Sequence, residues 1–268
     1  MSPAFAVMGI VNVTPDSFSD GGRFLDADAA VTHALKLVAE GASLLDVGGE
    51  STRPGAEPVG EAEELRRVVP VIERLRGRLP GEIRISVDTC KSAVAAAALD
   101  AGADLVNDVT ALRGDRAMAD LVAERGVEVC LMHMLGEPRT MQDDPRYDEV
   151  VGDVSRFLLE RVEFAVGRGV AEERILLDPG IGFGKTVEHN LELLRRLDEI
   201  VALGRPVLVG TSRKSFLGRL TGREVDDRLA GTIATNVMAL ERGARIFRVH
   251  EVAPVLDALK VAAATVAA

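Results

Sequence analysis

Eight short apolar runs recur along this chain, and each one leads into a loop through a polar or charged residue. The runs are rich in Val, Ile and Leu, which is typical of strands that are buried on both faces of a parallel sheet. A segment with helical spacing lies between most consecutive runs. The runs are Val7–Val11, Leu44–Val47, Ile83–Val87, Leu105–Val106, Val129–Met132, Ile175–Leu177, Val207–Val209 and Ile246–Val249. Eight strand–helix pairs predict an α/β fold of the (β/α)8 or TIM-barrel type.

The segments between the runs carry signals for the ends of helices. Most of them stop at a glycine, the residue preferred just beyond a helix C-terminus. Asp26 or Asp28 can cap the first helix, which continues to Glu40. The other predicted helices are Glu61–Arg76, Lys91–Leu99, Asp115–Glu124, Val150–Val166, Val187–Ala202, Arg228–Glu241 and Pro254–Val266.

Three of the connections that follow a strand are long. They run from Thr14 to Leu25, from Gly48 to Gly60 and from Met134 to Tyr147. Long loops in a compact domain are more often functional than accidental. Because all three leave the C-terminal rim of the predicted barrel, where active sites of this fold lie, we expect them to act as lids.

Length and composition fit a single enzyme domain. The chain has 268 residues, and one (β/α)8 barrel takes about 250. No linker or change in composition divides it, so we expect one domain over residues 1–268. The chain starts without the basic segment of a signal peptide, and no apolar stretch approaches the roughly 20 residues of a membrane span. We therefore expect a cytoplasmic protein with no membrane partner, in which Cys90 and Cys130 are reduced, incidental thiols.

The charge of the chain narrows the class of ligand. A net charge of −10 argues against nucleic acid as a partner, and the absence of Trp leaves few surfaces for stacking bases. A small anionic ligand would have to meet a local cationic pocket within an acidic protein.

Some local patterns do not hold up as binding motifs. The segment Gly180-Ile-Gly-Phe-Gly-Lys185-Thr186 ends like a phosphate-binding loop, but Pro179 replaces its first glycine. The same segment lacks the third glycine of a dinucleotide-binding fingerprint. The four histidines are dispersed, so a zinc site made by protein ligands alone is not expected.

Two groups of polar residues remain at the strand ends. Asp88, Asn107, Asp178 and Lys214 follow different strands and should face one barrel mouth, where they could bind the polar edge of a flat heterocycle. The second group has cations and small donors that suit a diphosphate, and the first and eighth strands of a barrel are neighbours. Its members are Asn12, Thr52, Arg53, Arg248 and His250. Phe18 and Phe183 are candidates for contact with a ring.

These residues lie in motifs that resemble the dihydropteroate synthase family of the folate pathway. The similarity runs from Met8 to His250, nearly the whole chain. Its most specific segments are Asp46-Val-Gly-Gly-Glu-Ser-Thr-Arg-Pro-Gly55, Ser86-Val-Asp-Thr89, Asp178-Pro-Gly-Ile-Gly-Phe-Gly-Lys185 and Thr211-Ser-Arg-Lys-Ser215. The resemblance implies a barrel, often a homodimer, that joins 6-hydroxymethyl-7,8-dihydropterin diphosphate to p-aminobenzoate and releases diphosphate with Mg²⁺.

The resemblance also implies residue roles. The pterin ring is assigned to Asp88, Asn107, Met132, Asp178, Phe183, Lys214 and Arg248. The diphosphate is assigned to Asn12, Thr52, Arg53, Arg248 and His250, and Asn12 is also assigned to the Mg²⁺ ion. The p-aminobenzoate slot is assigned to Phe18, Pro54 and Ser215. The catalytic role is assigned to Arg53, Lys214, Arg248 and His250.

The resemblance implies a dissociative reaction, in which diphosphate leaves before the arylamine attacks a pterin-methylene cation. Closed loops would keep water away from that cation. Sulfonamides are expected to compete with p-aminobenzoate, because Phe18 and the Thr52–Arg53–Pro54 segment are of the usual type. Two alternatives are a pterin-dependent methyltransferase and a catalytically silent pterin-binding paralogue. Arg53, Lys214 and His250 favour the synthase, since methyl transfer needs no diphosphate site.

Overall fold

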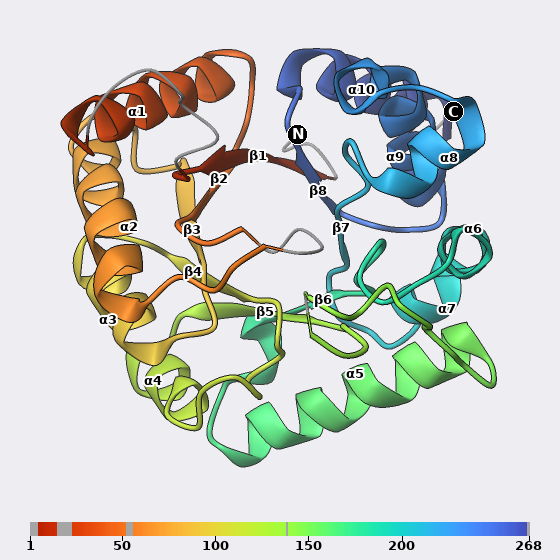
Figure 1. Cartoon of the computed structure of the whole chain (residues 1–268), viewed down its shortest axis with the longest axis horizontal. Coiled ribbons are helices and arrows are strands. Elements are labelled where there is room, and N and C mark those ends of the chain that lie inside the picture. Colours follow the sequence, from red (N-terminus) through yellow and green to blue (C-terminus); the bar gives the residue numbers. More distant parts are fainter. Residues whose placement is uncertain (1–4, 15–22, 52–55, 138, 267–268) are drawn as a thin grey trace.

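The strands lie in a parallel sheet that curves into an almost closed barrel (Figure 1). The computed structural model describes residues 5–14, 23–51, 56–137 and 139–266. Neighbouring strands follow the order β6-β5-β4-β3-β2-β1-β8-β7. The strands are β1 (Ala6–Asn12), β2 (Leu44–Gly48), β3 (Arg84–Asp88), β4 (Leu105–Asp108), β5 (Glu128–Met132), β6 (Ile175–Asp178), β7 (Leu208–Val209) and β8 (Ile246–Val249). The predicted (β/α)8 architecture is confirmed.

The barrel closes between β6 and β7 through very little pairing. Leu177 forms a single bridge with Val207, and its N–H donates to the Pro206 carbonyl over 3.0 Å. Strand β7 has only two residues, Leu208 and Val209, and both pair with β8. Among the described residues, this seam is the shortest ladder between neighbouring strands.

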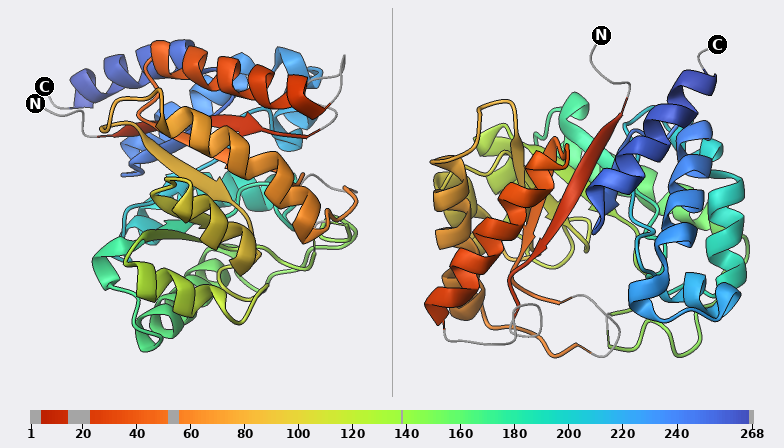
Figure 2. Two further views of the ribbon diagram at one scale, coloured as in Figure 1. Left: turned by 90° about the vertical axis from the view of Figure 1, so that its left-hand side faces the viewer. Right: turned by 90° about the horizontal axis from the view of Figure 1, so that it is seen from above.

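Helices surround the barrel and cover the outer faces of the strands (Figures 1 and 2). They are α1 (Arg23–Ala39), α2 (Glu61–Arg76), α3 (Ser92–Asp100), α4 (Met118–Arg125), α5 (Val150–Gly167), α6 (Val187–Arg195), α7 (Leu197–Val201), α8 (Ser215–Thr221), α9 (Leu229–Glu241) and α10 (Val252–Val266). Short 3-10 turns occupy Glu172–Arg174 and Val225–Asp227. In the described part of the chain, no helix is long and apolar enough to cross a membrane.

Three points of the helix prediction need correction. The first helix begins at Arg23, so positions 26 and 28 lie within it and not at its N-cap as expected for Asp26 or Asp28. The single helix expected over Val187–Ala202 is two helices that meet at Arg196. The Arg196 guanidinium donates to Glu192 on one side of the break and to Glu199 on the other, so ion pairs stabilise the interruption. Helix α8 was not predicted, because its seven residues are too few to show helical spacing and include Gly218.

The core has two compartments on either side of the sheet. Inside the barrel, one side chain from each of seven strands forms a tight plug: Met8, Leu44, Leu105, Cys130, Leu176, Leu208 and Ile246. The larger compartment lies between strands and helices and includes Val11, Leu45 and Phe247. The plug fills the barrel interior, so a ligand must bind at one of the two ends of the barrel.

The described parts of the connections that follow β2 and β5 lie at the same end of the barrel, as the right-hand view of Figure 2 shows. This end is the C-terminal one, where Asn12, Gly48 and Met132 end their strands. Residues 15–22 and 52–55 of the first two connections lie outside the described residues. The expected role of the three connections as lids remains a prediction.

Candidate active site

A guanidinium held between two buried carboxylates forms the centre of the barrel mouth. Arg248 on β8 donates from Nε to Asp46 Oδ2 over 2.6 Å and from Nη2 to Asp88 Oδ2 over 2.8 Å. Asn107 on β4 donates from Nδ2 to the same Asp46 oxygen over 3.1 Å. Four strands, β2, β3, β4 and β8, therefore contribute to one hydrogen-bonded cluster because their carboxyl ends lie at one rim.

Burial and the neighbouring charges together set the protonation of Arg248 and Asp88. Although burial disfavours its charge, the Asp46 and Asp88 carboxylates hold the pKa of Arg248 above its ordinary value. Burial, followed by the neighbouring Asp46 carboxylate, raises the pKa of Asp88 to about 7. Arg248 is thus a permanent cation, whereas Asp88 can hold or release a proton near neutral pH. A carboxyl group of this kind can either accept from or donate to a polar ring edge.

The opposite wall of the mouth carries Asp178, Phe183 and Lys214. Burial raises the pKa of the Asp178 carboxyl, while the charges of Lys214 and Arg248 act on the same group to lower it. Lys214 Nζ lies 3.8 Å from the centroid of the Phe183 ring. A positive charge at this distance from a ring face is a cation–π contact. The structure therefore brings Lys214 and Phe183 together and sets both near Asp178.

An apolar floor lies between these walls. Met132, at the end of β5, is buried with Val109, Met134 and Met141, and Phe183 packs against this cluster. Methionine side chains adapt their shape and make favourable contacts with aromatic rings. A flat ring bound at the mouth would thus have polar groups at its edges and an apolar surface on one face.

The turn that presents Phe183 is fixed from beneath by a buried lysine. Lys185 Nζ lies 2.9 Å from His133 Nδ1 and donates to the Phe183 carbonyl over 3.0 Å. Burial lowers the pKa of Lys185 to about 7 and that of His133 to about 2, so His133 is neutral and can accept from the lysine. Gly180 has φ of +67°, and a Cβ atom there would overlap the His133 carbonyl. The turn accordingly requires glycine at this position.

Asn12 and His250, which are assigned to the diphosphate, and Ser215 lie where β1, β7 and β8 end. Asn12 is half-buried at the last position of β1, which pairs with β8. His250 directly follows β8, and its Nδ1 lies 2.9 Å from Ser212 Oγ, whose oxygen also accepts from the His250 backbone N–H over 3.2 Å. Ser215 is exposed at the first position of α8, next to Lys214. Four candidates, Phe18, Thr52, Arg53 and Pro54, lie outside the described residues.

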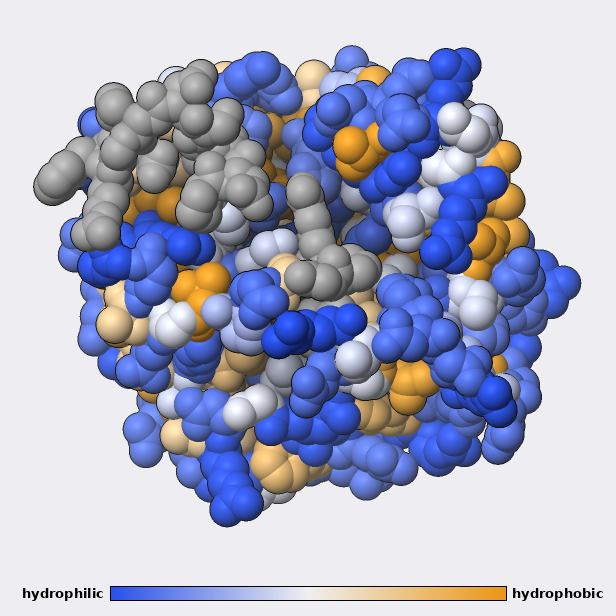
Figure 3. Space-filling view, viewed as in Figure 1, coloured by the Kyte–Doolittle hydropathy of each residue, from blue (hydrophilic) through white to orange (hydrophobic). Residues whose placement is uncertain are grey.

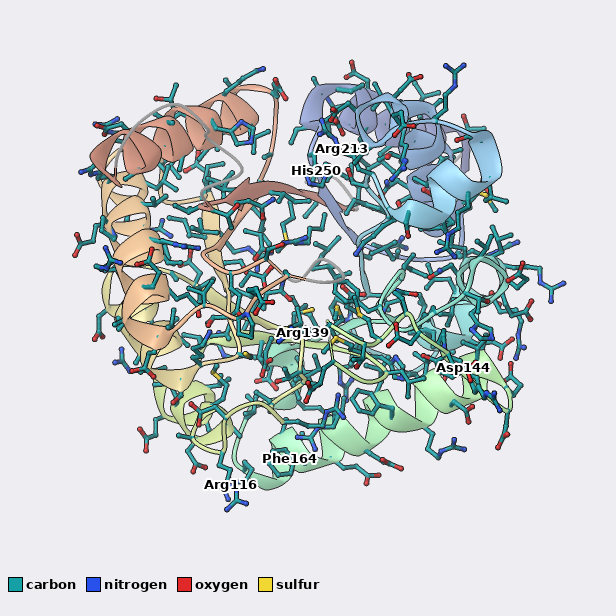
Figure 4. All side chains as sticks on the ribbon, viewed as in Figure 1. Arg116, Arg139, Asp144, Phe164, Arg213 and His250 are labelled. Atoms are coloured by element: carbon teal, nitrogen blue, oxygen red, sulfur yellow. The ribbon has the colours of Figure 1, made fainter. Side chains whose placement is uncertain are left out.

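A cavity of about 180 Å³ opens beside Asp88. Glu50, Cys90, Met134 and Arg139 contribute to its walls, and Figure 4 places Arg139 over the barrel mouth. Burial raises the pKa of the Cys90 thiol to about 11, so this group stays protonated near neutral pH. Cys130 is fully buried in the barrel plug and burial raises its pKa as well. Both observations fit the expectation of unreactive thiols.

The sequence did not single out two polar residues of this site, Asp46 and Ser212. Asp46 lies inside an apolar strand and not at its end. A single acid among Leu44, Leu45 and Val47 is the feature that could have marked it as a buried functional carboxylate. Ser212 lies beside the Arg213–Lys214 pair, and a serine in a loop gives no signal of its own.

Comparisons with known proteins agree with this geometry. The family described as pterin binding enzyme matches residues 8–250. The dihydropteroate synthase of Haemophilus influenzae is 47% identical over 97% of this chain and 93% of its own length. A Yersinia pestis dihydropteroate synthase solved as a sulfonamide drug complex is 46% identical, with a TM-score of 0.93 over 98% of this chain and 94% of its own. A Xanthomonas albilineans dihydropteroate synthase solved with 4-aminobenzoic acid is 52% identical, with a TM-score of 0.92 over 98% and 93% of the two chains.

Proposed function

This chain belongs to the dihydropteroate synthase family of pterin-binding enzymes, and on that premise we propose a role for each part of its barrel mouth. The enzyme is a transferase of folate biosynthesis that joins 6-hydroxymethyl-7,8-dihydropterin diphosphate to p-aminobenzoate, giving 7,8-dihydropteroate and diphosphate. The observation that carries the assignment of roles is Arg248, which links Asp46 and Asp88 at the point where four strands end.

The pterin ring is proposed to bind between the two polar walls. Asp88, Asn107 and Asp178 would bind its amino and ring N–H edge, and Lys214 would donate to a ring nitrogen or carbonyl. Met132 and Phe183 would contact the faces of the ring, and Arg248 would stack on it. The proposal is supported by the position of these groups on β3, β4, β5, β6 and the ends of β7 and β8, around one apolar floor.

The diphosphate is proposed to bind across the ends of β1 and β8. Arg248 and His250 would donate to its oxygens, together with Thr52 and Arg53. Arginine suits this task because its planar fork of N–H donors matches phosphate geometry. The register that pairs β1 with β8 supports the proposal, because it sets Asn12 and His250 at neighbouring strand ends.

A Mg²⁺ ion is proposed to accompany the diphosphate. The donor set fits, because Mg²⁺ usually takes one or two protein oxygens together with substrate phosphates and water. Asn12 supplies such an amide oxygen, and the described residues contain no cluster of three or more acids, histidines or cysteines that would hold the ion alone. When bound, the ion would neutralise charge that develops on the leaving diphosphate.

The chemistry is proposed to be dissociative. The bond between the pterin methylene carbon and the diphosphate oxygen breaks, and its electron pair leaves with the diphosphate. The arylamine nitrogen then forms a bond to the methylene cation and loses a proton. Asp178 and Asp88 would stabilise the delocalised cation, while Arg248 and His250 hold the leaving group. The protein thus contributes position and electrostatics, without covalent catalysis.

The slot for p-aminobenzoate is proposed to lie at Ser215, with Phe18 and Pro54 from the first two connections. Relatives solved with 4-aminobenzoic acid and with a sulfonamide drug support a site for such ligands, and its position at Ser215 rests on the family resemblance. Sulfonamides should therefore compete with p-aminobenzoate. The competition is measured as a rise in the apparent KM for p-aminobenzoate, and activity that millimolar sulfonamide leaves unchanged at limiting p-aminobenzoate contradicts it.

We also propose that the whole chain acts as one domain in a cytoplasmic homodimer. Helix α9 packs against both α8 and α10, and the three helices expose Leu220, Met238 and Val261. Figure 3 shows apolar residues gathered at its right-hand edge, on the side of the molecule where α8 lies. Sedimentation of the wild type and of Met238→Glu tests this assignment, which predicts a dimer for the former and a monomer for the latter.

The overall test is the release of diphosphate from dihydropterin diphosphate in Mg²⁺ buffer, with and without p-aminobenzoate. Release that is coupled to formation of 7,8-dihydropteroate supports the proposed roles. Pterin binding without release would instead favour a silent pterin-binding protein or a methyl-transfer enzyme.

A further inference from the structure

The backbone at Arg213 is held in a conformation that non-glycine residues rarely adopt. Its φ is +58°, in the left-handed region. Two side chains around the start of α9 secure it: the Arg213 N–H donates to Thr232 Oγ1 over 3.2 Å, and Arg228 Nη1 donates to the Arg213 carbonyl over 3.0 Å. Strained residues of this kind persist where the surroundings fix them, and they concentrate at functional sites.

The Arg213 side chain reaches across to the loop that follows β8. Its Nε donates to Glu251 Oε1 over 2.6 Å, and its Nη2 contacts the same oxygen. A third donor, Nη1, lies 3.0 Å from Asp226 Oδ1. The two acids differ in burial, because the Glu251 side chain is 23% exposed and that of Asp226 is 83% exposed. Water therefore stabilises the Glu251 carboxylate less than that of Asp226, and Glu251 depends more on the guanidinium to compensate its charge.

The ion pair lies directly beside two residues of the proposed active site. Arg213 precedes Lys214, and Glu251 follows His250. The Ser212 hydroxyl adds a second link between the same two loops, through its contact with His250 Nδ1. Figure 4 shows Arg213 and His250 near one another at the ends of β7 and β8.

We propose that Arg213 and Glu251 are positioning residues that hold Lys214 and His250 in register with each other. The inference rests on the proposed function of those two residues. Lys214 would bind the pterin and His250 the diphosphate, so a fixed distance between their loops matches the fixed distance between ring and leaving group. Arg213 is not itself a ligand in this scheme, because two carboxylates already occupy its donors.

The experiment compares variants that break the ion pair in different ways. Glu251→Gln removes one charge with little change in size. Arg213→Gly removes the side chain but favours the backbone conformation at this position, since glycine adopts positive φ without strain. The control is Asp226→Asn, which removes the exposed partner of the same arginine. Each variant is assayed for kcat/KM of dihydropteroate formation and for binding of inorganic diphosphate by calorimetry, at a temperature well below its Tm.

Glu251→Gln and Arg213→Gly should each lower kcat/KM at least tenfold and weaken diphosphate binding by a similar factor, while Asp226→Asn stays within twofold of the wild type. A purely structural role would lower Tm and leave both measurements unchanged in the folded protein. Wild-type values in both loop variants would overturn the inference. Failure of the wild type to form dihydropteroate would instead overturn the proposed function, and diphosphate binding would still test the ion pair.

Discussion

Arg248 serves both the folded state and the proposed chemistry. Its guanidinium is the counter-ion of Asp46 and Asp88, and it is also the group that we place against the pterin and the diphosphate. Removing one partner of a buried ion pair is costly, because the remaining charge loses its compensation. Sequence reasoning treated Arg248 as a ligand-binding residue alone, since the two acids lie about 200 and 160 positions away along the chain.

Arg248→Ala should therefore reduce stability as well as activity. We expect a loss of about 3–5 kcal/mol in the free energy of unfolding, as for other broken buried ion pairs, together with a fall in kcat/KM of at least a hundredfold. Urea denaturation and steady-state kinetics measure the two effects. Arg248→Lys, which keeps the charge but cannot bridge both acids, should lose less stability. An alanine variant as stable as the wild type would show that the cluster does not need its cation.

Asp88 gives the unliganded protein a specific pH dependence. Its pKa rises from 3.8 in the unfolded chain to about 7 in the folded protein, so between these values the folded state binds more protons. Stability contributed by Asp88 is then fully present below about pH 4 and is lost as the pH rises through about 7. Asp88→Asn should remove this decrease. The free energy of unfolding measured by urea from pH 5 to pH 8 tests it, and an equal slope in both proteins would contradict the raised pKa.

At the scale of single elements, the turn after β6 depends on glycine for two separable reasons. Gly180 combines a positive φ with a close approach to the His133 carbonyl. Gly126, at the end of α4, has a similar φ of +60° but no neighbour within 4 Å of its Cβ position. The two positions therefore separate the cost of backbone conformation from the cost of steric overlap.

Gly126→Ala should cost about 1–2 kcal/mol, the penalty for a left-handed L-residue, and should leave activity unchanged. Gly180→Ala should cost more and should weaken pterin binding, because the turn that carries Phe183 must move away from β5. Thermal unfolding and pterin binding by calorimetry provide the comparison. Equal effects of the two substitutions would mean that the turn relieves the overlap without moving Phe183.

Single strands and helices also show which features could be predicted from the sequence. Asp88, Asn107 and Asp178 were predictable because parallel strands bring their carboxyl ends to one rim. Asp46 was not singled out because it precedes the end of its strand. The break at Arg196 and the short helix α8 depend on side-chain ion pairs and on a seven-residue segment, and neither produces a periodic pattern.

At the scale of the whole molecule, the barrel is unevenly closed. The seam between β6 and β7 has one bridge, whereas β1 and β2 are paired over five residues. Local opening is easiest where few backbone hydrogen bonds hold neighbouring segments together. The circular order of strands was predictable from eight strand–helix pairs, but the position of the weakest closure was not, because it depends on how far each strand extends.

Hydrogen exchange should reveal this seam in the unliganded protein. The amide of Leu177, which donates across the seam to Pro206, should exchange sooner than those of Leu45 and Val87, because opening at the seam needs fewer bonds to break than opening elsewhere. Exchange followed by mass spectrometry or NMR measures the order. Uniform protection around the barrel would show that the seam opens only with global unfolding.

A pterin bound as proposed would also stabilise this seam. Asp178 ends β6 on one side of it, and Lys214 follows β7 on the other. A ligand that binds both residues therefore links β6 to β7 across the seam, where the fewest backbone hydrogen bonds hold neighbouring strands together. Ligands that bind only the folded state raise its stability in proportion to the logarithm of their concentration. Equally tight binders therefore raise the global stability equally, but only a compound that spans the seam also suppresses its local opening. Slower hydrogen exchange at the Leu177 amide should identify such compounds, so an exchange screen could sort inhibitors by where they bind.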